Sequence, residues 1–566
     1  MLNGIPTTAT HANNFSAPGG TNVTLTTANP FFFRPVGATG TSETVVYNLL
    51  PIIGQLSNRA FAHSTEVILG GDYKLPHDFR LQATFNYGLA TNEARQPGFD
   101  STALSTAAAG TTVATALDPF GGHTNPSVAA AIGNFENFFS SNQKLYDYQA
   151  KVDGPLFTLP GGQVKVAVGA DWRKYRYDAV NTVGNIGANQ NRGAASAERT
   201  ITAEFGEILV PIVGADNAIP FVQSLNLSAA VRHDNYSDFG GTTNPKYGVT
   251  WSPLAGLAIR ASYGKSFHAP DMGDSYAVDT RALYFVNFPI VPPGSPPADT
   301  IALAGGNPGL QPEKATTYSV GGEFAPNWLP GFRASLTYWN IKYTGLIRTA
   351  PISQEVFTNP AYAQFYVLNP TQAQLDAIAS TFRVVQTSLP LPPGIKQIID
   401  LRRHNLGATN TDGFDYDASY RWETSYGAFA AGLSGSRTMN FELSGAPGAV
   451  FIPQNNFIKT RWRGELSWVK GPVAADLAWN HSGQFNQVYS LAAGGTNVQS
   501  VKPFDTVDVH LGYDFGDRRW VSGTTVSLNV DNLFDKDPPL LLAGGGFSGA
   551  ASPLGRTIWA GVQKKW

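Results

Sequence analysis

One segment of the sequence fits a nucleotide-binding pattern. Residues 544–549, GGGFSG, match G-x-G-x-x-G, in which glycines let the backbone approach a pyrophosphate at the start of a helix. That chemistry needs a strand before the glycines and a helix after them, whereas Pro553 and an extended segment follow here. We therefore expect a flexible glycine loop and predict no cofactor.

The histidines and acidic residues show no spacing that suits a metal or hydrolytic centre. The nine histidines include no H-x-x-x-H or H-E-x-x-H pair, and cysteine is absent. His233, Asp234 and Asp238 are close enough in sequence to approach an ion, but a hydrated loop is the favoured interpretation. No G-x-S-x-G nucleophile elbow occurs. The sequence predicts no bound metal and a protein that is not an enzyme.

Aromatic residues in two long predicted links are the candidates for substrate contact. Their rings are suited to stacking on sugars or on aromatic chelates, although packing within the loops explains them equally well. The four residues are Tyr284, Phe285, Phe288 and Tyr366.

The residues FDYDASYRWE, 414–423, alternate strictly between two chemical characters. Side chains alternate across a β-strand, so every second residue lies on the same face. The large apolar residues share one face: Phe414, Tyr416, Ala418, Tyr420 and Trp422. The charged and polar residues share the other: Asp415, Asp417, Ser419, Arg421 and Glu423. A helix would scatter the aromatic rings around its axis, so the pattern indicates a strand with one apolar and one polar face.

The same alternation recurs along most of the chain and predicts an all-β fold, a large antiparallel transmembrane β-barrel with lipid outside and water inside. Charged pairs such as Asp415/Asp417 and Arg461/Arg463 are then expected to solvate the lumen. Many segments approach the roughly 10 residues that a tilted strand needs to cross a bilayer. We predict about 17 such strands, near 63–74, 80–91, 145–157, 163–177, 199–211, 225–232, 243–251, 256–268, 313–325, 331–348, 414–423, 427–441, 461–468, 472–483, 506–515, 521–534 and 556–566.

The links between these strands alternate between short and long. Tight turns rich in proline, glycine and aspartate occupy 75–79, 158–162, 252–256, 326–331, 470–472 and 516–519. Long links occupy 92–144, 178–198, 269–312, 349–409, 442–456, 484–502 and 535–555, and the short 237–242 is the one exception. Short turns on one rim and long loops on the other are typical of an outer-membrane barrel. Within 349–409, a short helix is predicted over 369–382, starting at Thr371.

Tryptophans gather at the short links and at the C-terminus, on one predicted rim. Interfacial aromatic residues form girdles at the level of the lipid headgroups. These residues are Trp251, Trp328, Trp422, Trp468, Trp520 and Trp566. The last strand ends on an aromatic residue, and Lys564 on its apolar face is expected to extend toward the rim.

Composition adds limits on compartment and partner. Charged residues form 14% of the chain and the net charge is −2, so nothing indicates a nucleic-acid partner. No segment approaches the roughly 18 apolar residues of a membrane-spanning helix. The first 20 residues have neither a basic region nor an apolar core, so they do not form a secretory signal peptide.

Four motifs, taken together in their order along the chain, resemble the barrel domain of TonB-dependent outer-membrane receptors. YGKSFHAPDM (263–272) is similar to the family's F-R-A-P strand end, with a histidine where arginine is common. NPGLQPEKATTYSVGGEF (307–324) looks like its N-x-x-L-x-P-E segment, and NLFD (532–535) looks like its motif near the penultimate strand. The strand pair 231–253 is also similar. The carried-over residues are Ala269, Pro270, Pro312, Glu313, Asn532, Leu533, Phe534, Asp535 and Trp566.

The resemblance implies a barrel of 22 strands filled by an N-terminal plug, with a TonB box that receives energy from the TonB–ExbB–ExbD complex. About 17 to 19 of those strands are expected here. We expect residues 63–566 to form the barrel domain and residues 1–62 to be an N-terminal remnant with an outer loop. Within that remnant, the segments 21–27, 30–36 and 43–50 are expected to supply one or two further strands of the barrel. The plug, TonB box and signal peptide are not found, so a truncated gene model or a fragment is the expected explanation, ahead of one half of a split receptor.

The resemblance further implies TonB-energised uptake of a ferric siderophore, a vitamin or a glycan across the outer membrane of a Gram-negative bacterium. The expected partners are outer-membrane lipid, the TonB complex and a small-molecule or oligosaccharide substrate. Two alternatives stay open, a plugless passive porin and a soluble all-β glycan-binding protein. The first would need a barrel that this chain closes alone, because open sheet edges in lipid are costly.

Overall fold

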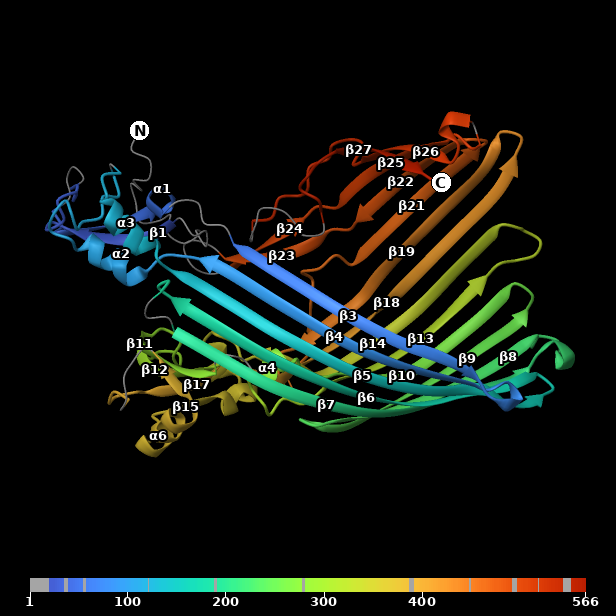
Figure 1. Cartoon of the computed structure of the whole chain (residues 1–566), viewed down its shortest axis with the longest axis horizontal. Helices are drawn as coiled ribbons and strands as arrows, with labels where there is room; N and C mark the ends of the chain where they lie inside the picture. The colour runs from blue at the N-terminus through green and yellow to red at the C-terminus, as the bar shows by residue number, and fades with distance from the viewer. Residues whose placement is uncertain are drawn as a thin grey trace.

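The computed structural model describes residues 20–34, 39–53, 58–120, 122–187, 191–276, 280–385, 391–446, 449–490, 496–517, 519–542 and 551–565. Most of these residues belong to one large antiparallel sheet that wraps around a lumen (Figure 1). The glycine-rich segment 544–549 and Trp566 lie outside the described residues.

The predicted barrel fold is confirmed, and every predicted barrel strand is present. The barrel strands, in their order around the sheet, are β3 (Arg59–Lys74), β4 (Arg80–Pro97), β5 (Glu136–Leu159), β6 (Gly162–Gly184), β7 (Asn191–Val213), β8 (Ser224–Tyr236), β9 (Gly240–Leu254), β10 (Leu257–His268), β13 (Glu313–Phe324), β14 (Phe332–Thr349), β18 (Arg403–Thr424), β19 (Gly427–Ser444), β20 (Ile452–Pro453), β21 (Thr460–Lys470), β22 (Val473–Ser482), β25 (Phe504–Asp514), β26 (Thr524–Asp531) and β27 (Thr557–Lys564). The two-residue β20 pairs only with the end of β19, so β21 is the next full strand.

Strands β3 and β27 are the two ends of this ladder. The order of the sheet brings β27 round to the side of β3. Residue registers join each full strand to the next from β3 through to β27, and among the described residues none joins β27 to β3. Both strands run toward the short-turn end, so they are parallel to each other (Figure 1).

Cross-strand register gives the sheet two chemically different faces. Phe414 is paired with Tyr338 and Tyr416 with Leu336, so the apolar residues of neighbouring strands share the convex face. Leu336 is 54% exposed there. Asp415 is paired with Thr337, on the lumen face. The alternation read from the sequence therefore separates an apolar exterior from a polar interior.

Several strands extend beyond the predicted bounds at the long-loop end. β5 has 24 residues and starts at Glu136, about nine residues before its alternation becomes regular. Its first residues, ENFFSSNQK, show no two-residue period. The strand continues there through backbone pairing with β4 and β6, which needs no apolar face.

The long loops fold into compact units at the outer end (Figure 1, left). The largest is a five-stranded sheet, β15-β17-β12-β11-β16, with short helices beside it. Its strands are β11 (Arg281–Phe288), β12 (Ala298–Ala304), β15 (Tyr366–Leu368), β16 (Arg383–Val385) and β17 (Gln397–Asp400). The loop helices are α4 (Met272–Ser275), α5 (Glu355–Thr358), η4 (Pro360–Phe365) and α6 (Gln372–Thr381). The predicted helix is confirmed as α6, and a capping box between Thr371 and Gln374 starts it.

The N-terminal residues form a second loop unit rather than barrel strands. β1 (Gly20–Thr26) and β2 (Ser42–Asn48) pair only with each other, whereas they were expected to add strands to the barrel. Leu25, Val45 and Leu49 are buried against α2 (Ser101–Ala108), from the loop after β4. Their apolar side chains pack in this small core, so the β1–β2 hairpin pairs within the loop unit and not with the edge strand of the barrel. The remaining elements are α1 (Leu50–Ile53), α3 (Pro126–Gly133), the hairpin β23 (Phe485–Ser490) and β24 (Thr496–Val501), and the turns η2 (Pro76–Asp78), η3 (Ala215–Asn217) and η5 (Arg519–Val521).

The opposite end consists of tight turns bordered by tryptophans. Trp328 and Trp520 are 77% and 92% exposed, and the indole of Trp468 donates to the Tyr426 carbonyl at 2.9 Å. Lys564 donates to the Ser522 carbonyl in the turn before β26. The lysine on the apolar face of the last strand thus extends to the rim, as predicted. Of the described helices, none has the length and apolar character needed to span a membrane.

If the convex surface faces lipid, strand β21 should tolerate a charged side chain on its lumen face but not on its convex face. Leu466 lies on the convex face of β21 between Ala431 and Leu477, and its neighbour Ser467 faces the lumen opposite Asp476. Leu466→Arg is expected to lower the free energy of unfolding by about 2–4 kcal/mol, because it places a charge in the apolar band. Ser467→Arg should change it by less than about 1 kcal/mol. Urea titration in lipid vesicles measures both, and equal losses would contradict the assignment of faces.

Candidate functional site

The NLFD motif forms a turn at the outer end of β26. Asn532 and Asp535 both have φ of +52°, a region that asparagine and aspartate adopt more readily than other residues. The Asn532 side chain accepts from the Lys536 amide and donates to its carbonyl, both at 2.9 Å. Asp535 Oδ1 accepts from the Arg556 amide at 2.8 Å. The motif therefore ties the top of β26 to the start of β27.

The two residues between them complete this turn. The Leu533 amide donates to the Val507 carbonyl at 2.7 Å, which holds the turn against β25. Phe534 is 72% exposed. The contacts of Asn532 and Asp535 and the backbone contact of Leu533 all stabilise the turn, and they give the motif no role in binding a ligand.

Two more of the family motifs, 263–272 and 307–324, meet at Glu313, the first residue of β13 after Pro312. Its carboxylate accepts from the Tyr343 hydroxyl at 2.6 Å, from the Ile347 amide at 2.6 Å and from His268 Nδ1 at 3.0 Å. His268 ends β10, directly before Ala269-Pro270. The buried carboxylate thereby holds the histidine that stands in the family's arginine position.

A cavity of about 730 Å³ opens where these motifs meet. Its lining includes Tyr175, Tyr177, Arg199, Tyr236, His268 and the 269–273 segment. Register places the three tyrosines and Arg199 on the lumen face of β6, β7 and β8. The cavity is thus an aromatic-walled space inside the barrel near the long-loop end, partly bounded by Ala269 and Pro270.

Arg199 is fixed in the wall of this cavity. Its Nε and Nη2 donate to Asp238 Oδ2 at 2.9 and 2.6 Å, and both side chains are at least nine-tenths buried. The guanidinium carbon lies 5.7 Å from the Tyr236 ring and 5.6 Å from the Phe239 ring. At 237–242 the chain makes a short turn where a long outer loop was expected. The ion pair between Arg199 and Asp238 holds this turn against β7.

The ion site considered at His233, Asp234 and Asp238 does not assemble. Asp238 is paired with Arg199, and Asp234 Oδ1 accepts from Arg232 at 2.9 Å. His233 Nδ1 lies 2.8 Å from the Thr243 hydroxyl. Within the ranges that the structure describes, no three histidine or acidic side chains form a metal-binding group.

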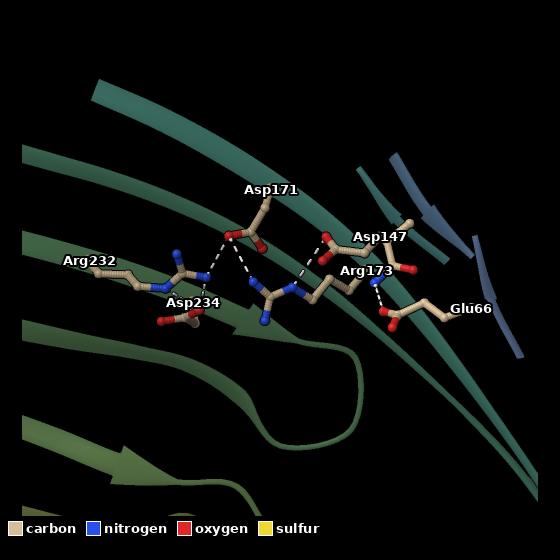
Figure 2. Close-up of polar contacts among 7 residues, drawn as sticks. Glu66, Asp147, Asp171, Arg173, Arg232 and Asp234 are labelled. Carbon is tan, nitrogen blue, oxygen red and sulfur yellow. Dashed lines mark hydrogen bonds and ion pairs between the residues drawn. The ribbon is translucent and has the colours of Figure 1, made fainter. Parts of the chain in front are cut away.

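A chain of polar contacts runs along the lumen wall from β5 to β8 (Figure 2). Asp171 Oδ2 accepts from Arg232 at 2.7 Å and lies 3.5 Å from Arg173, whose Nε lies 3.4 Å from Asp147. A separate hydrogen bond joins β4 to β3, where Asn86 donates to Glu66 at 2.7 Å. The Asp171 side chain is fully buried and that of Asp234 is 5% exposed, so both carboxylates depend on Arg232.

We call the contacts among Asp147, Asp171, Arg173, Arg232 and Asp234 the charge ladder, and they were not predicted from the sequence. A signal exists: Asp171/Arg173 and Arg232/Asp234 repeat the two-residue charge spacing seen in FDYDASYRWE. The contact between Asp171 and Arg232 joins residues 61 positions apart and depends on the register across β6, β7 and β8.

The four loop aromatics lie in different parts of the outer loops, Tyr284 and Tyr366 each beside an apolar cluster and Phe285 and Phe288 against each other. Tyr284 lies against the apolar core of the loop sheet and donates to Asp299 Oδ2 at 2.7 Å, while Phe285 and Phe288 lie 5.1 Å apart. Tyr366 packs against Phe357 in a second cluster, centred on Tyr362 and Phe365. None of the four lines the 730 Å³ cavity. Their role in substrate contact stays a prediction.

Asp400, at the end of β17, joins the loop sheet to the barrel. Burial alone would raise the pKa of Asp400, but the His404 ring and the Arg402 guanidinium hold it well below its ordinary value. Arg402 Nε donates to Asp400 Oδ1 at 2.9 Å, and the Arg402 guanidinium lies 5.3 Å from the Phe382 ring. This ion pair connects the end of α6 to the start of β18.

Comparison with known proteins places this architecture. Residues 5–533 match the family described as "TonB dependent receptor-like, beta-barrel". The chain belongs to the TonB-dependent receptor family. Similar solved structures include the siderophore receptor PirA from Acinetobacter baumannii (TM-score 0.60, 14% identity, 89% of this chain) and the pyoverdine receptor FpvA from Pseudomonas aeruginosa (0.55, 11%, 91%). The chain spans 62% of the length of each.

A third similar structure, titled as the copper transporter OprC, has a TM-score of 0.51 at 14% identity and covers 92% of this chain and 67% of that one. At these identities the likeness shows the fold alone. Within a receptor barrel, the convex face is the lipid-facing face and the charge ladder lies inside.

The charge ladder predicts an asymmetric response to losing two lumen arginines. Arg232→Ala removes the arginine paired with the buried Asp234 carboxylate and the nearer of the two arginines beside Asp171, so we expect a loss on the order of 3 kcal/mol in the free energy of unfolding. Arg260→Ala is the matched control, because Arg260 and Glu323 are both more than half exposed. Its loss should stay below about 1 kcal/mol. Urea unfolding in detergent compares them, and similar losses would show that Arg232 is not required by the buried carboxylates.

The Asp400 ion pair predicts acid-dependent opening of the loop sheet. A carboxylate whose pKa is lowered by folding contributes stability that is present above its unfolded pKa, about 3.9, and is lost as the pH falls below that. Hydrogen exchange at β17, corrected for intrinsic rates, should therefore accelerate between pH 5 and pH 3. In Asp400→Asn it should be fast at pH 5 already, while Asp376→Asn on exposed α6 should behave as wild type. An unchanged pH profile in Asp400→Asn would contradict the role of this ion pair.

Proposed function

We propose that this protein is an outer-membrane receptor for TonB-energised uptake of a ferric siderophore in a Gram-negative bacterium. The observation that carries the proposal is the aromatic-walled cavity of about 730 Å³ inside the barrel, near the long-loop end. Its volume lies in the range of small-molecule sites, roughly 300–1,000 Å³. TonB and the ExbB–ExbD complex are the proposed energy partners, on the basis of family membership.

The wall of the cavity favours an aromatic chelate over a vitamin or a glycan. Tyr175 and Tyr177 of β6 and Tyr236 of β8 offer ring faces and hydroxyls. Arg199 adds a cation whose position is fixed by Asp238. Flat aromatic groups with ring oxygens, as in catecholate chelates, can stack on such rings and accept hydrogen bonds from them. The similar structures titled as siderophore receptors support the same class.

Binding of a defined panel tests the substrate class. Titration of the purified chain with a ferric catecholate, a ferric hydroxamate, ferric citrate, cyanocobalamin and maltohexaose should show the tightest binding for the ferric catecholate. Tyr177→Ala should weaken it by about 2- to 10-fold through the lost ring contact. Tyr247→Ala is the matched control, since Tyr247 is on the lipid-facing side of β9 and 53% exposed. Equal binding by the two variants would exclude this cavity as the site.

Uptake separates the receptor from the other two functions. Iron accumulation from the same chelate should require TonB in cells that carry the gene. A passive porin would instead show TonB-independent uptake and steady conductance in planar bilayers. A soluble glycan-binding protein would stay in solution without detergent and show no heat-modifiable gel mobility.

A further inference from the structure

Three lysines on neighbouring strands lie on the lipid-facing side of the barrel. Register pairs Lys265 of β10 with Thr316 of β13, and Thr316 with Lys342 of β14. Lys314 of β13 is paired with Phe267 and with Thr344, two positions further toward the long loops. All three lysines are exposed. With strands about 4.8 Å apart, Lys265 and Lys342 have Cα atoms about 10 Å apart, so the three side chains can converge on one group.

A row of tyrosines lies directly below these lysines, on the side of the short turns. Tyr263, Tyr318 and Tyr338 are on the same face of the same three strands, two to four residues further along each strand. The rings of Tyr318 and Tyr338 are 6.2 Å apart, and the Tyr338 ring is 5.2 Å from that of Phe414. Such a row marks the boundary between acyl chains and headgroups. The lysines therefore lie at headgroup level, on the long-loop side.

None of these lysines has a carboxylate partner among the described residues. Two nearby acidic residues have other partners, and Glu442 of β19 lies beyond Lys342 with one strand between them, in register with Asn410. Glu313 is bonded on the lumen face, and Asp412, 9% exposed, accepts from Asn440 at 3.0 Å. A basic group at the corresponding height on β6 differs, because Lys174 is paired with Glu198 at 2.9 Å and Arg176 with Asp178 at 2.8 Å. Unlike Lys174 and Arg176, the three lysines of β10, β13 and β14 have no ion-pair partner among the described residues.

We propose that Lys265, Lys314 and Lys342 form a binding site for the phosphate groups of a phosphorylated glycolipid in the outer leaflet. Three unpaired ammonium groups match a headgroup that carries more than one phosphate, and the tyrosine row below them contacts the start of the acyl chains. The site is outside the lumen and separate from the substrate cavity. It rests on the proposed outer-membrane location and not on the identity of the transported nutrient.

Lipid titration of the full chain in detergent tests the site. Purified protein is titrated with lipopolysaccharide, and the rise in thermal midpoint gives an apparent affinity. The triple variant Lys265→Gln, Lys314→Gln, Lys342→Gln should lose affinity on the order of a hundred-fold, about five-fold for each lysine. The control triple Lys74→Gln, Lys151→Gln, Lys246→Gln removes the same charge from the lumen face and should bind as wild type.

Three results would overturn the proposal. They are wild-type affinity in the lipid-facing triple variant, equal binding of lipopolysaccharide whose phosphates have been removed, and an equal rise in midpoint with inorganic phosphate alone. Heat-modifiable mobility of each variant shows that it is folded before it is titrated. Chelate binding by the lipid-facing variant should be unchanged, so failure of this site and failure of the proposed uptake function give different results.

Discussion

Backbone hydrogen bonding between neighbouring strands is the constraint on which the rest of this protein depends. In a bilayer no water can satisfy an unpaired amide or carbonyl, so each spanning strand must be paired along its length. Pairing fixes register, and register decides which side chains face lipid and which face the lumen. The ion pair between Asp171 and Arg232 exists because β6, β7 and β8 are aligned in this way. A slip of one residue would turn Arg232 into the lipid.

The same constraint bears on the two ends of the ladder. The full strands from β3 to β27 number 17 in the described part of the sheet, an odd count, so β3 and β27 run in the same direction. Two parallel strands cannot join by the antiparallel pairing used everywhere else in this barrel. Antiparallel closure of this sheet would need an odd number of intervening strands.

Sequence alone predicted the barrel where lipid imposes a pattern and lost accuracy where it does not. Phe414 to Glu423 alternates because one face meets an apolar solvent, and its strand was found. The start of β5 at Glu136 was missed, because above the bilayer both faces meet water and the period disappears. The loop sheet was missed for another reason. Its parallel pairing of β12 with β17 joins residues about 100 positions apart, and no local pattern records that contact.

The site shows the same division between local and distant information. The family motifs were recognised, and their side chains hold neighbouring segments together. Glu313 accepts from His268 and from the Tyr343 hydroxyl, and Arg403 lies 2.9 Å from Asp274. These contacts hold the segment that carries Ala269 and Pro270 from both sides. Burial raises the pKa of Asp274 and Arg403 opposes it, which shows how enclosed this junction is. The motif residues therefore set the shape of the cavity, whereas local sequence patterns do not identify the side chains that line its wall.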